Sequence, residues 1–294
     1  MPTTELPPLP PMPSAFREVP SGDYFRVPYM SFSRLKGIAG SFLATDPHTG
    51  GYQITPRSYE ARKLGQFAVN EQTDAMKIGT GAHAIVLEKD WRTQIRVSDS
   101  KPGGAGFFTD AKTTLTEKQF AECAQIAAKV RPIIAKLENS VGYWNTELSL
   151  FWQDGTDGVM PCKARLDWCG IKNRTAFIVD LKVTEDPRPY KFSRKACELK
   201  YPLQAAHYTA GALASLRVDR CEFYFLAVSA EPPRLAVLHK VSTHDLGDVE
   251  DRRQFYLAEI ARRELSGDWT DPYEKDHEIW DLKLPKPRDN TRTG

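Results

Sequence analysis

The chain has 294 residues, of which 41% are hydrophobic and 27% are charged. These values are ordinary for a soluble protein that is long enough to bury a large core, and they argue against disordered and fibrous classes. No apolar run reaches eighteen residues, and no charged-then-apolar leader opens the chain, so we expect neither a membrane span nor a secretion signal.

The cysteines and the net charge further narrow the class of protein. Five cysteines form no C-x-x-C pair. We therefore expect free thiols in the cytoplasm, and the spacing supports neither a zinc site nor an iron–sulfur cluster. The formal net charge is only +2, so any binding of nucleic acid has to rely on local positive charge.

A proline-rich segment opens the chain. Residues 1–20 contain seven prolines, including the run PPLPPMP. This composition forms neither a helix nor a central strand, so we expect residues 1–28 to be a flexible arm, either a solvated tail or a docking arm for another subunit. A second flexible segment, basic and proline-containing, is expected at 271–294. A single domain is then expected over 29–270.

Helical patterns come first in this domain and strands follow. Apolar residues recur at helical spacing from residue 31, near residues 73–89 and over residues 116–137. Gly-rich stretches at residues 45–57 and 92–110 predict loops. Three strands in a meander are predicted at residues 147–152, 159–170 and 175–183, because the turns QDGTDG and IKNR separate them.

The last third of the domain returns to alternating elements. A helix at about 195–216, strands at 221–229 and 234–242, and a helix from His244 to about Leu265 are predicted. The order predicts an α+β (α/β) domain with a central mixed β-sheet flanked by helices and a helical N-terminal extension.

The third strand, AFIVDLKVT at residues 176–184, contains two charges. A period of two places Ile178, Asp180 and Lys182 on one face, opposite Phe177 and its apolar partners. Charged groups are rarely buried without a partner or a metal ion. The pattern therefore indicates either a structural Asp180–Lys182 ion pair or a functional site.

The preceding strand adds a second carboxylate. In KARLDW, Asp167 shares a face with Arg165 and Lys163, and an antiparallel hairpin can bring Asp167 opposite Asp180. Two carboxylates suit Mg²⁺ or Mn²⁺, and Lys182 could hold a water or stabilise negative charge. A structural Asp167–Lys182 pair remains the alternative.

These residues resemble a known motif. Asp167 followed by VDLK resembles the PD-(D/E)XK nuclease motif, and Gln204 and Tyr208 in YPLQAAHY resemble the Q-x-x-x-Y of its RecB-type and RecE-type branch. GTGAHAIVLE resembles the G-T-x-x-H segment of that branch, with Gly81 as an apparent insertion and His83 as the match. The segments SFSRLKGIAGS and NTELSLFW, with Glu147, also match in order over about residues 30–260.

The resemblance implies a restriction-endonuclease-like core and roles for individual residues. His83, Asp167, Asp180 and the backbone carbonyl of Leu181 would bind Mg²⁺ or Mn²⁺. Lys182 would orient the attacking water, and Gln204 and Tyr208 would complete the catalytic set. Glu147 and Tyr201 are second-tier candidates. Core packing is the alternative for both tyrosines and for His83.

A basic segment follows the third strand directly. RPYKFSRKACELK contains five cations against one acid, and we expect DNA contacts from Arg188, Lys191, Arg194, Lys195 and Lys200. A solvated loop and helix start is the alternative. Adjacency to the expected metal site favours phosphate contact.

The resemblance implies an exodeoxyribonuclease that degrades linear double-stranded DNA 5′→3′ and leaves 3′ single strands for recombination. It also implies a ring-shaped homo-oligomer and a single-strand annealing protein as partner. Two alternatives remain: a structure-specific or single-strand endonuclease on the same core, and a catalytically idle DNA-binding or scaffold protein.

Overall fold

A computed structural model describes residues 12–16, 19, 23–24, 27, 29–36, 72–97, 113–155 and 160–270. The predicted loop at 45–57, most of the predicted loop at 92–110 and the tail at 271–294 lie outside these residues. No helix in the described part of the chain is both long and apolar enough to cross a membrane.

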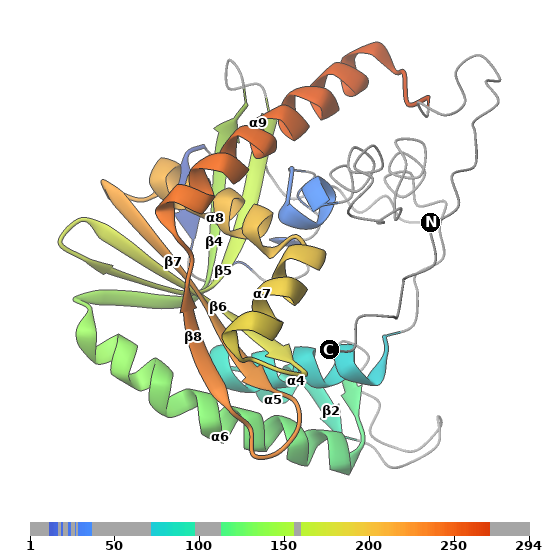
Figure 1. Ribbon diagram of the computed structural model, residues 1–294, viewed down its shortest axis with the longest axis vertical. Coiled ribbons are helices and arrows are strands. Elements are labelled where there is room, and N and C mark those ends of the chain that lie inside the picture. Colours follow the sequence, from blue (N-terminus) through green and yellow to red (C-terminus); the bar gives the residue numbers. More distant parts are fainter. Residues whose placement is uncertain are drawn as a thin grey trace, which may run out of the picture.

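A mixed six-stranded sheet forms the centre of the protein, in the order β1-β4-β5-β6-β7-β8 (Figure 1). The strands are β1 (Ser14–Phe16), β4 (Tyr143–Asp154), β5 (Met160–Lys172), β6 (Thr175–Thr184), β7 (Arg220–Ser229) and β8 (Ala236–Lys240). Strands β4, β5 and β6 form the predicted antiparallel meander, and β6 and β7 are parallel. A separate parallel pair joins β2 (Ile95–Val97) to β3 (Thr113–Leu115).

Helices cover both faces of the sheet, as predicted (Figure 1). The helices are α4 (Asp74–Leu87), the short α5 (Trp91–Gln94), α6 (Glu117–Ser140), α7 (Pro189–Glu198), α8 (Tyr201–Ser215) and α9 (Thr243–Ser266). On one face, side chains of α4 and α6 form one core with Val179 and Leu181 of β6. On the other, side chains of α7, α8 and α9 form a second core that includes Ile178. The period-two pattern of β6 therefore divides its side chains between two cores.

Two glycines allow close packing of the helices that carry candidate site residues. A Cβ added at Gly81 of α4 would lie 2.8 Å from Leu115 Cδ1 and 2.9 Å from Cys123 Sγ, and one at Gly211 of α8 would lie 2.7 Å from Trp152. A side chain at either position would push the helix outward. The apparent insertion of Gly81 thus lies where α4 packs tightly on Leu115 of β3 and Cys123 of α6.

The predicted helix at 195–216 is two helices. α7 ends at Glu198, and α8 begins at Tyr201 after Lys200, whose φ of 61° lies in the left-handed region. Pro202 has no N–H to continue the hydrogen bonds of the first helix, but it is well suited to the first turn of a new one. The apolar pattern continues across the break, which is why it predicted one helix.

The described residues of the proline-rich segment lie against the sheet. β1 pairs antiparallel with β4, and Met30 bridges to Cys162 of β5. The buried Lys163 ammonium donates hydrogen bonds of 2.6 Å to the carbonyls of Tyr24 and Val27. The expectation of a free arm over residues 1–28 therefore does not hold for these residues.

Candidate active site

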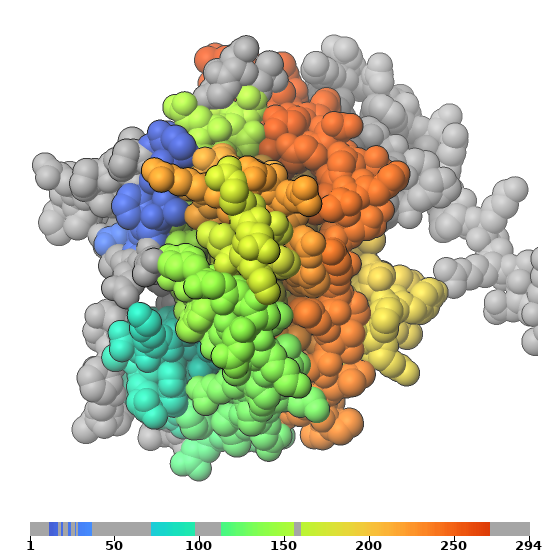
Figure 2. Space-filling model, turned by 90° about the vertical axis from the view of Figure 1, so that its left-hand side faces the viewer, coloured from blue at the N-terminus to red at the C-terminus, as the bar shows by residue number. Residues whose placement is uncertain are grey.

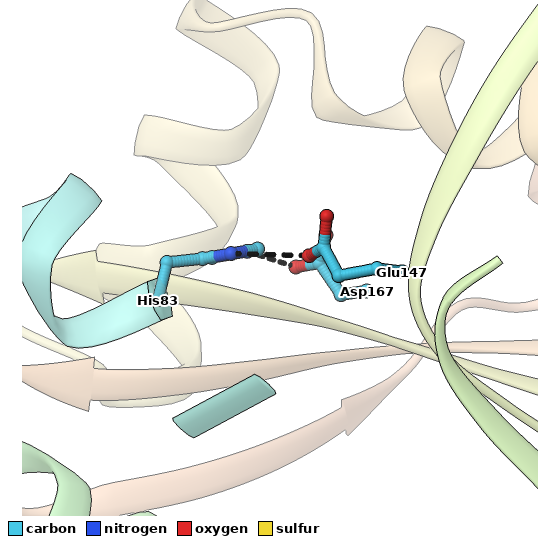
Figure 3. Close-up of side chains that lie close together, drawn as sticks. All are labelled: His83, Glu147 and Asp167. Carbon is cyan, nitrogen blue, oxygen red and sulfur yellow. Dashed lines mark hydrogen bonds and ion pairs between the residues drawn. The ribbon is translucent and has the colours of Figure 1, made fainter. Parts of the chain in front are cut away.

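Three side chains from three different elements, His83 of α4, Glu147 of β4 and Asp167 of β5, point toward one another (Figure 3). His83 Nε2 lies 2.5 Å from Asp167 Oδ2, and His83 Nδ1 lies 3.7 Å from Glu147 Oε1. One nitrogen or oxygen atom from each residue lies within 4.8 Å of the others. The His83 side chain is 30% exposed, so solvent reaches the group.

The sheet register places the two carboxylates beside each other. Thr146 pairs with Trp168 and Leu148 pairs with Leu166, so Glu147 of β4 lies opposite Asp167 of β5. Glu147 has a φ of 51°, which lies in the left-handed region. Non-glycine residues held in such conformations cluster at functional sites. The resemblance implied Asp167 and His83 as ligands of the same metal ion. Glu147 was only a second-tier candidate, because a glutamate at the edge of a strand is usually solvated.

Asp180 and Lys182 of β6 form a neighbouring buried pair. Asp180 is 1% exposed, and its side chain contacts the Lys182 ammonium. Gln204 of α8 donates a hydrogen bond of 2.8 Å to the other Asp180 oxygen. Asp180 does not belong to the group formed by His83, Glu147 and Asp167. A ligand role for Asp180 stays a prediction.

The two strands are also joined through backbone. The Leu181 N–H donates a hydrogen bond of 2.8 Å to Asp167 Oδ2, so Asp167 is held by both His83 and Leu181. Only the N–H of Leu181 is engaged in this contact. The predicted role of its carbonyl as a metal ligand remains a prediction.

The two tyrosines of α8 lie on different sides of the site. The Lys182 ammonium lies 4.7 Å from the centre of the Tyr201 ring. Tyr208 lines a pocket together with His83, Glu147 and Asp167. Tyr201 therefore presents the face of its ring to Lys182, in a cation–π contact.

Burial and neighbouring charges shift the pKa values of these groups. Burial alone lowers the pKa of His83, but Asp167 outweighs it and raises the pKa to about 9. Burial raises the pKa of Asp180 to about 6 against the opposing effect of Lys182. Burial lowers the pKa of Lys182, but Asp180 and Asp167 outweigh it and raise the pKa. Lys182 is therefore a cation at neutral pH.

A pocket of about 590 Å³ adjoins the group and is lined by cations that the sequence did not single out. Lys163 and Arg165 face it from β5, and Arg34 faces it from the N-terminal segment. Arg165 Nη1 lies 3.9 Å from Glu147 Oε2. The alternation in KARLDW already placed Lys163 and Arg165 on the same strand face as Asp167. This pattern could have indicated that both cations belong to the site.

His207 is a buried residue of α8. Its Nε2 lies 3.1 Å from the Lys163 carbonyl, and its ring lies 4.9 Å from that of Trp152. Burial lowers its pKa to about 3, so it is neutral.

The predicted DNA-binding cations lie on and beside α7. Arg188 caps the helix and pairs with Asp186, and Lys195 pairs with Glu198. Lys191 and Arg194 are exposed on the same helix, and Lys200 precedes α8. Whether these five side chains contact DNA stays a prediction.

The mixed sheet, the Asp167 and Asp180–Lys182 hairpin and the Gln204 helix together define the PD-(D/E)XK nuclease class. More particularly, the chain belongs to the family described as "PDDEXK-like domain of unknown function (DUF3799)", whose model matches residues 31–259. Membership supports a nuclease. A comparison with curated proteins finds no match.

Solved structures support the fold. A crystal structure of a "Putative exonuclease" from Eubacterium rectale is similar with a TM-score of 0.61 and 14% identity, and the similarity covers 91% of this chain and 96% of that one. The protein SSO0001 (10% identity, 67% and 82% covered) and the protein VC1899 from Vibrio cholerae (12%, 84% and 62%) have TM-scores of 0.25 and 0.20, which carry no argument.

The residues present fit a divalent metal ion. Two carboxylates and an imidazole are ligands that Mg²⁺ and Mn²⁺ accept, with the imidazole favouring Mn²⁺. His83 Nε2 and Asp167 Oδ2 contact each other directly, and both atoms are of a kind that can ligate a cation. His83, Glu147 and Asp167 thus form a group that could hold a metal ion.

Proposed function

We propose that the protein is a metal-dependent deoxyribonuclease that degrades linear double-stranded DNA from its 5′ ends and leaves 3′ single strands for recombination. The convergence of His83, Glu147 and Asp167 beside the Asp180–Lys182 pair carries the proposal. The direction of digestion and the role in recombination rest on the RecE-like motifs.

His83, Glu147 and Asp167 would hold the metal ion, with Asp180 as a further candidate. A bound Mg²⁺ or Mn²⁺ would supply Lewis-acid stabilisation of the phosphate and lower the pKa of a water. Family members of the PDDEXK-like type generally use such ions, which supports this assignment.

Lys182 would supply positive charge at the reacting phosphate. Because Asp180 and Asp167 keep it protonated, it would orient a water and stabilise developing negative charge rather than accept a proton. Gln204 holds Asp180 through its amide and so keeps the Asp180–Lys182 pair in place. Tyr208 lines the same pocket as Asp167.

The partners are proposed on the same basis. The cations of α7 would bind phosphates of the duplex and make binding dependent on salt. A ring-shaped homo-oligomer and a single-strand annealing protein follow from the resemblance, and a cytoplasmic location follows from the cysteines; all three belong to the proposal.

Digestion of end-labelled DNA tests the proposal. Linear duplex labelled at its 5′ or 3′ end and a closed circle are incubated with Mg²⁺ and either the native protein, Lys182→Ala or Lys240→Ala. Lys240 is an exposed β8 lysine paired with Glu222, so it is the matched control. We expect the 5′ label to be released first, circles to survive, and Lys182→Ala to lose at least about 100-fold in rate.

Other outcomes select the alternatives. Cutting of closed circles would replace the exonuclease by an endonuclease on the same core. Absence of cutting with both Mg²⁺ and Mn²⁺ would make Asp180–Lys182 a structural pair and favour the DNA-binding or scaffold protein.

A further inference from the structure

The outer side of α7 combines an exposed aromatic ring with unpaired positive charge. Tyr190 is 72% exposed, which is the highest value among the described exposed aromatic side chains. Arg194 is one helical turn further on, so the two lie on one face, and Lys191 adjoins both. We name Tyr190, Lys191 and Arg194 the outer patch of α7.

Two other cations of this segment are engaged with acids. Arg188 pairs with Asp186, and Lys195 pairs with Glu198. Among the described residues, no ion pair within 4.0 Å involves Lys191 or Arg194, so both retain charge for a ligand. In Figure 2 the golden-yellow atoms of this segment protrude at the right of the coloured part of the molecule.

The inner side of α7 is anchored close to the proposed catalytic residues. Phe192 is buried, stacks on His239 with ring centres 4.6 Å apart, and lies 6.2 Å from the Tyr201 ring. Tyr201 in turn contacts Lys182. Because two aromatic contacts connect α7 to Lys182, the outer patch has a fixed position relative to the active site.

An exposed aromatic ring between cations matches the chemistry of single-stranded nucleic acid. An unpaired base stacks on such a ring, and neighbouring cations bind the phosphates on either side. A duplex offers the phosphates but keeps its bases stacked inside. A helix face that only meets solvent would not need a tyrosine that is 72% exposed, although single exposed apolar residues do occur.

We propose that the outer patch of α7 binds an unpaired DNA strand, with a base stacked on Tyr190 and phosphates on Lys191 and Arg194. This inference deepens the proposed function by assigning a surface to the single strand that digestion leaves. It requires contact with unpaired bases, which the phosphate contacts proposed for the duplex do not.

Binding without cleavage tests it. The affinity of the full chain for a labelled single-stranded oligonucleotide and for the matching duplex is measured by fluorescence anisotropy in EDTA. We expect Tyr190→Ala to weaken single-strand binding about tenfold, with less than about a twofold effect on the duplex, and Tyr190→Phe to bind normally. For the single strand, Lys191→Gln and Arg194→Gln should each reduce the slope of log K against log[salt] by about 0.7.

Phe255→Ala is the matched control, because Phe255 is an exposed aromatic residue (55%) on α9. The proposal is overturned if Tyr190→Ala changes single-strand and duplex affinity equally, or no more than Phe255→Ala does. The measurement needs no metal, so a failure of the nuclease proposal would leave its outcome intact. Equal melting temperatures of all variants confirm that they fold.

Discussion

Glu147 shows how a single backbone conformation can serve a site. Its left-handed φ costs free energy in a residue with a Cβ, and glycine would avoid that cost. The conformation places its carboxylate beside His83 and opposite Asp167. The strain is thus tied to a residue that the metal site would use.

Replacing Glu147 by glycine should separate stability from metal binding. In EDTA we expect Glu147→Gly to raise the free energy of unfolding by about 1 kcal/mol, because the left-handed strain is relieved. Its affinity for Mn²⁺ should fall at least about tenfold, as measured by calorimetry. Glu147→Gln should keep the backbone strain and also bind Mn²⁺ weakly. Unchanged Mn²⁺ affinity in both variants would remove Glu147 from the ligand set.

Tyr201 is expected to act on Lys182 through its ring. A desolvated cation–π contact contributes about 2 kcal/mol, which corresponds to roughly 30-fold in rate. Tyr201→Leu should therefore lower kcat by about that factor with little change in KM, whereas Tyr201→Phe should stay within about threefold of the native enzyme. If both variants lose activity equally, the hydroxyl rather than the ring is required.

At the scale of elements, α9 is fixed to the sheet by a buried ion network. Arg253 of α9 is 1% exposed and donates to Asp154 of β4 and to Glu250. Trp152 and Gln254 also donate to Asp154, and these contacts hold the pKa of that carboxyl well below its usual value although burial raises it. The network thus holds α9 in its place on α8.

Breaking this network should destabilise the whole domain. Arg253→Met leaves a half-buried Asp154 without its cation, and we expect a loss of about 3–5 kcal/mol in urea unfolding. Arg262→Met, at an exposed pair with Glu259 on the same helix, is the control and should lose less than about 1 kcal/mol. Similar losses in the two variants would show that the buried network does not stabilise the domain.

At the scale of the whole molecule, residues far apart in sequence form one wall of the pocket. Tyr24, Val27 and Tyr29 line it from the N-terminal segment, and Glu147 and Asp167 line it from the sheet. Lys163 holds that segment through two backbone carbonyls, and Arg165 donates to a third, that of Val19. The N-terminal segment is therefore part of the site rather than an appendage.

Removing the Lys163 ammonium should loosen this wall locally. Lys163→Met removes the hydrogen bonds to the Tyr24 and Val27 carbonyls, at a cost of about 1–3 kcal/mol each. We expect amides of residues 29–36 to exchange hydrogen faster, while those of β6 keep their protection. Lys172→Met, which removes an exposed hydrogen bond to Ser140, is the control. Equal exchange in native and Lys163→Met protein would show that Lys163 does not hold the segment.

The sequence predicted the meander and the two-sided burial of β6, because period-two patterns and turn residues are local in sequence. The tertiary structure brought His83 to Asp167, which lies 84 residues further along the chain, and it placed Glu147 through strand register and a left-handed backbone that no pattern encodes. It also decided the packing of residues 12–36 on β4 and β5 and the contact of the Tyr201 ring with Lys182. These features depend on contacts between distant segments, and their free energy arises only when the chain is folded.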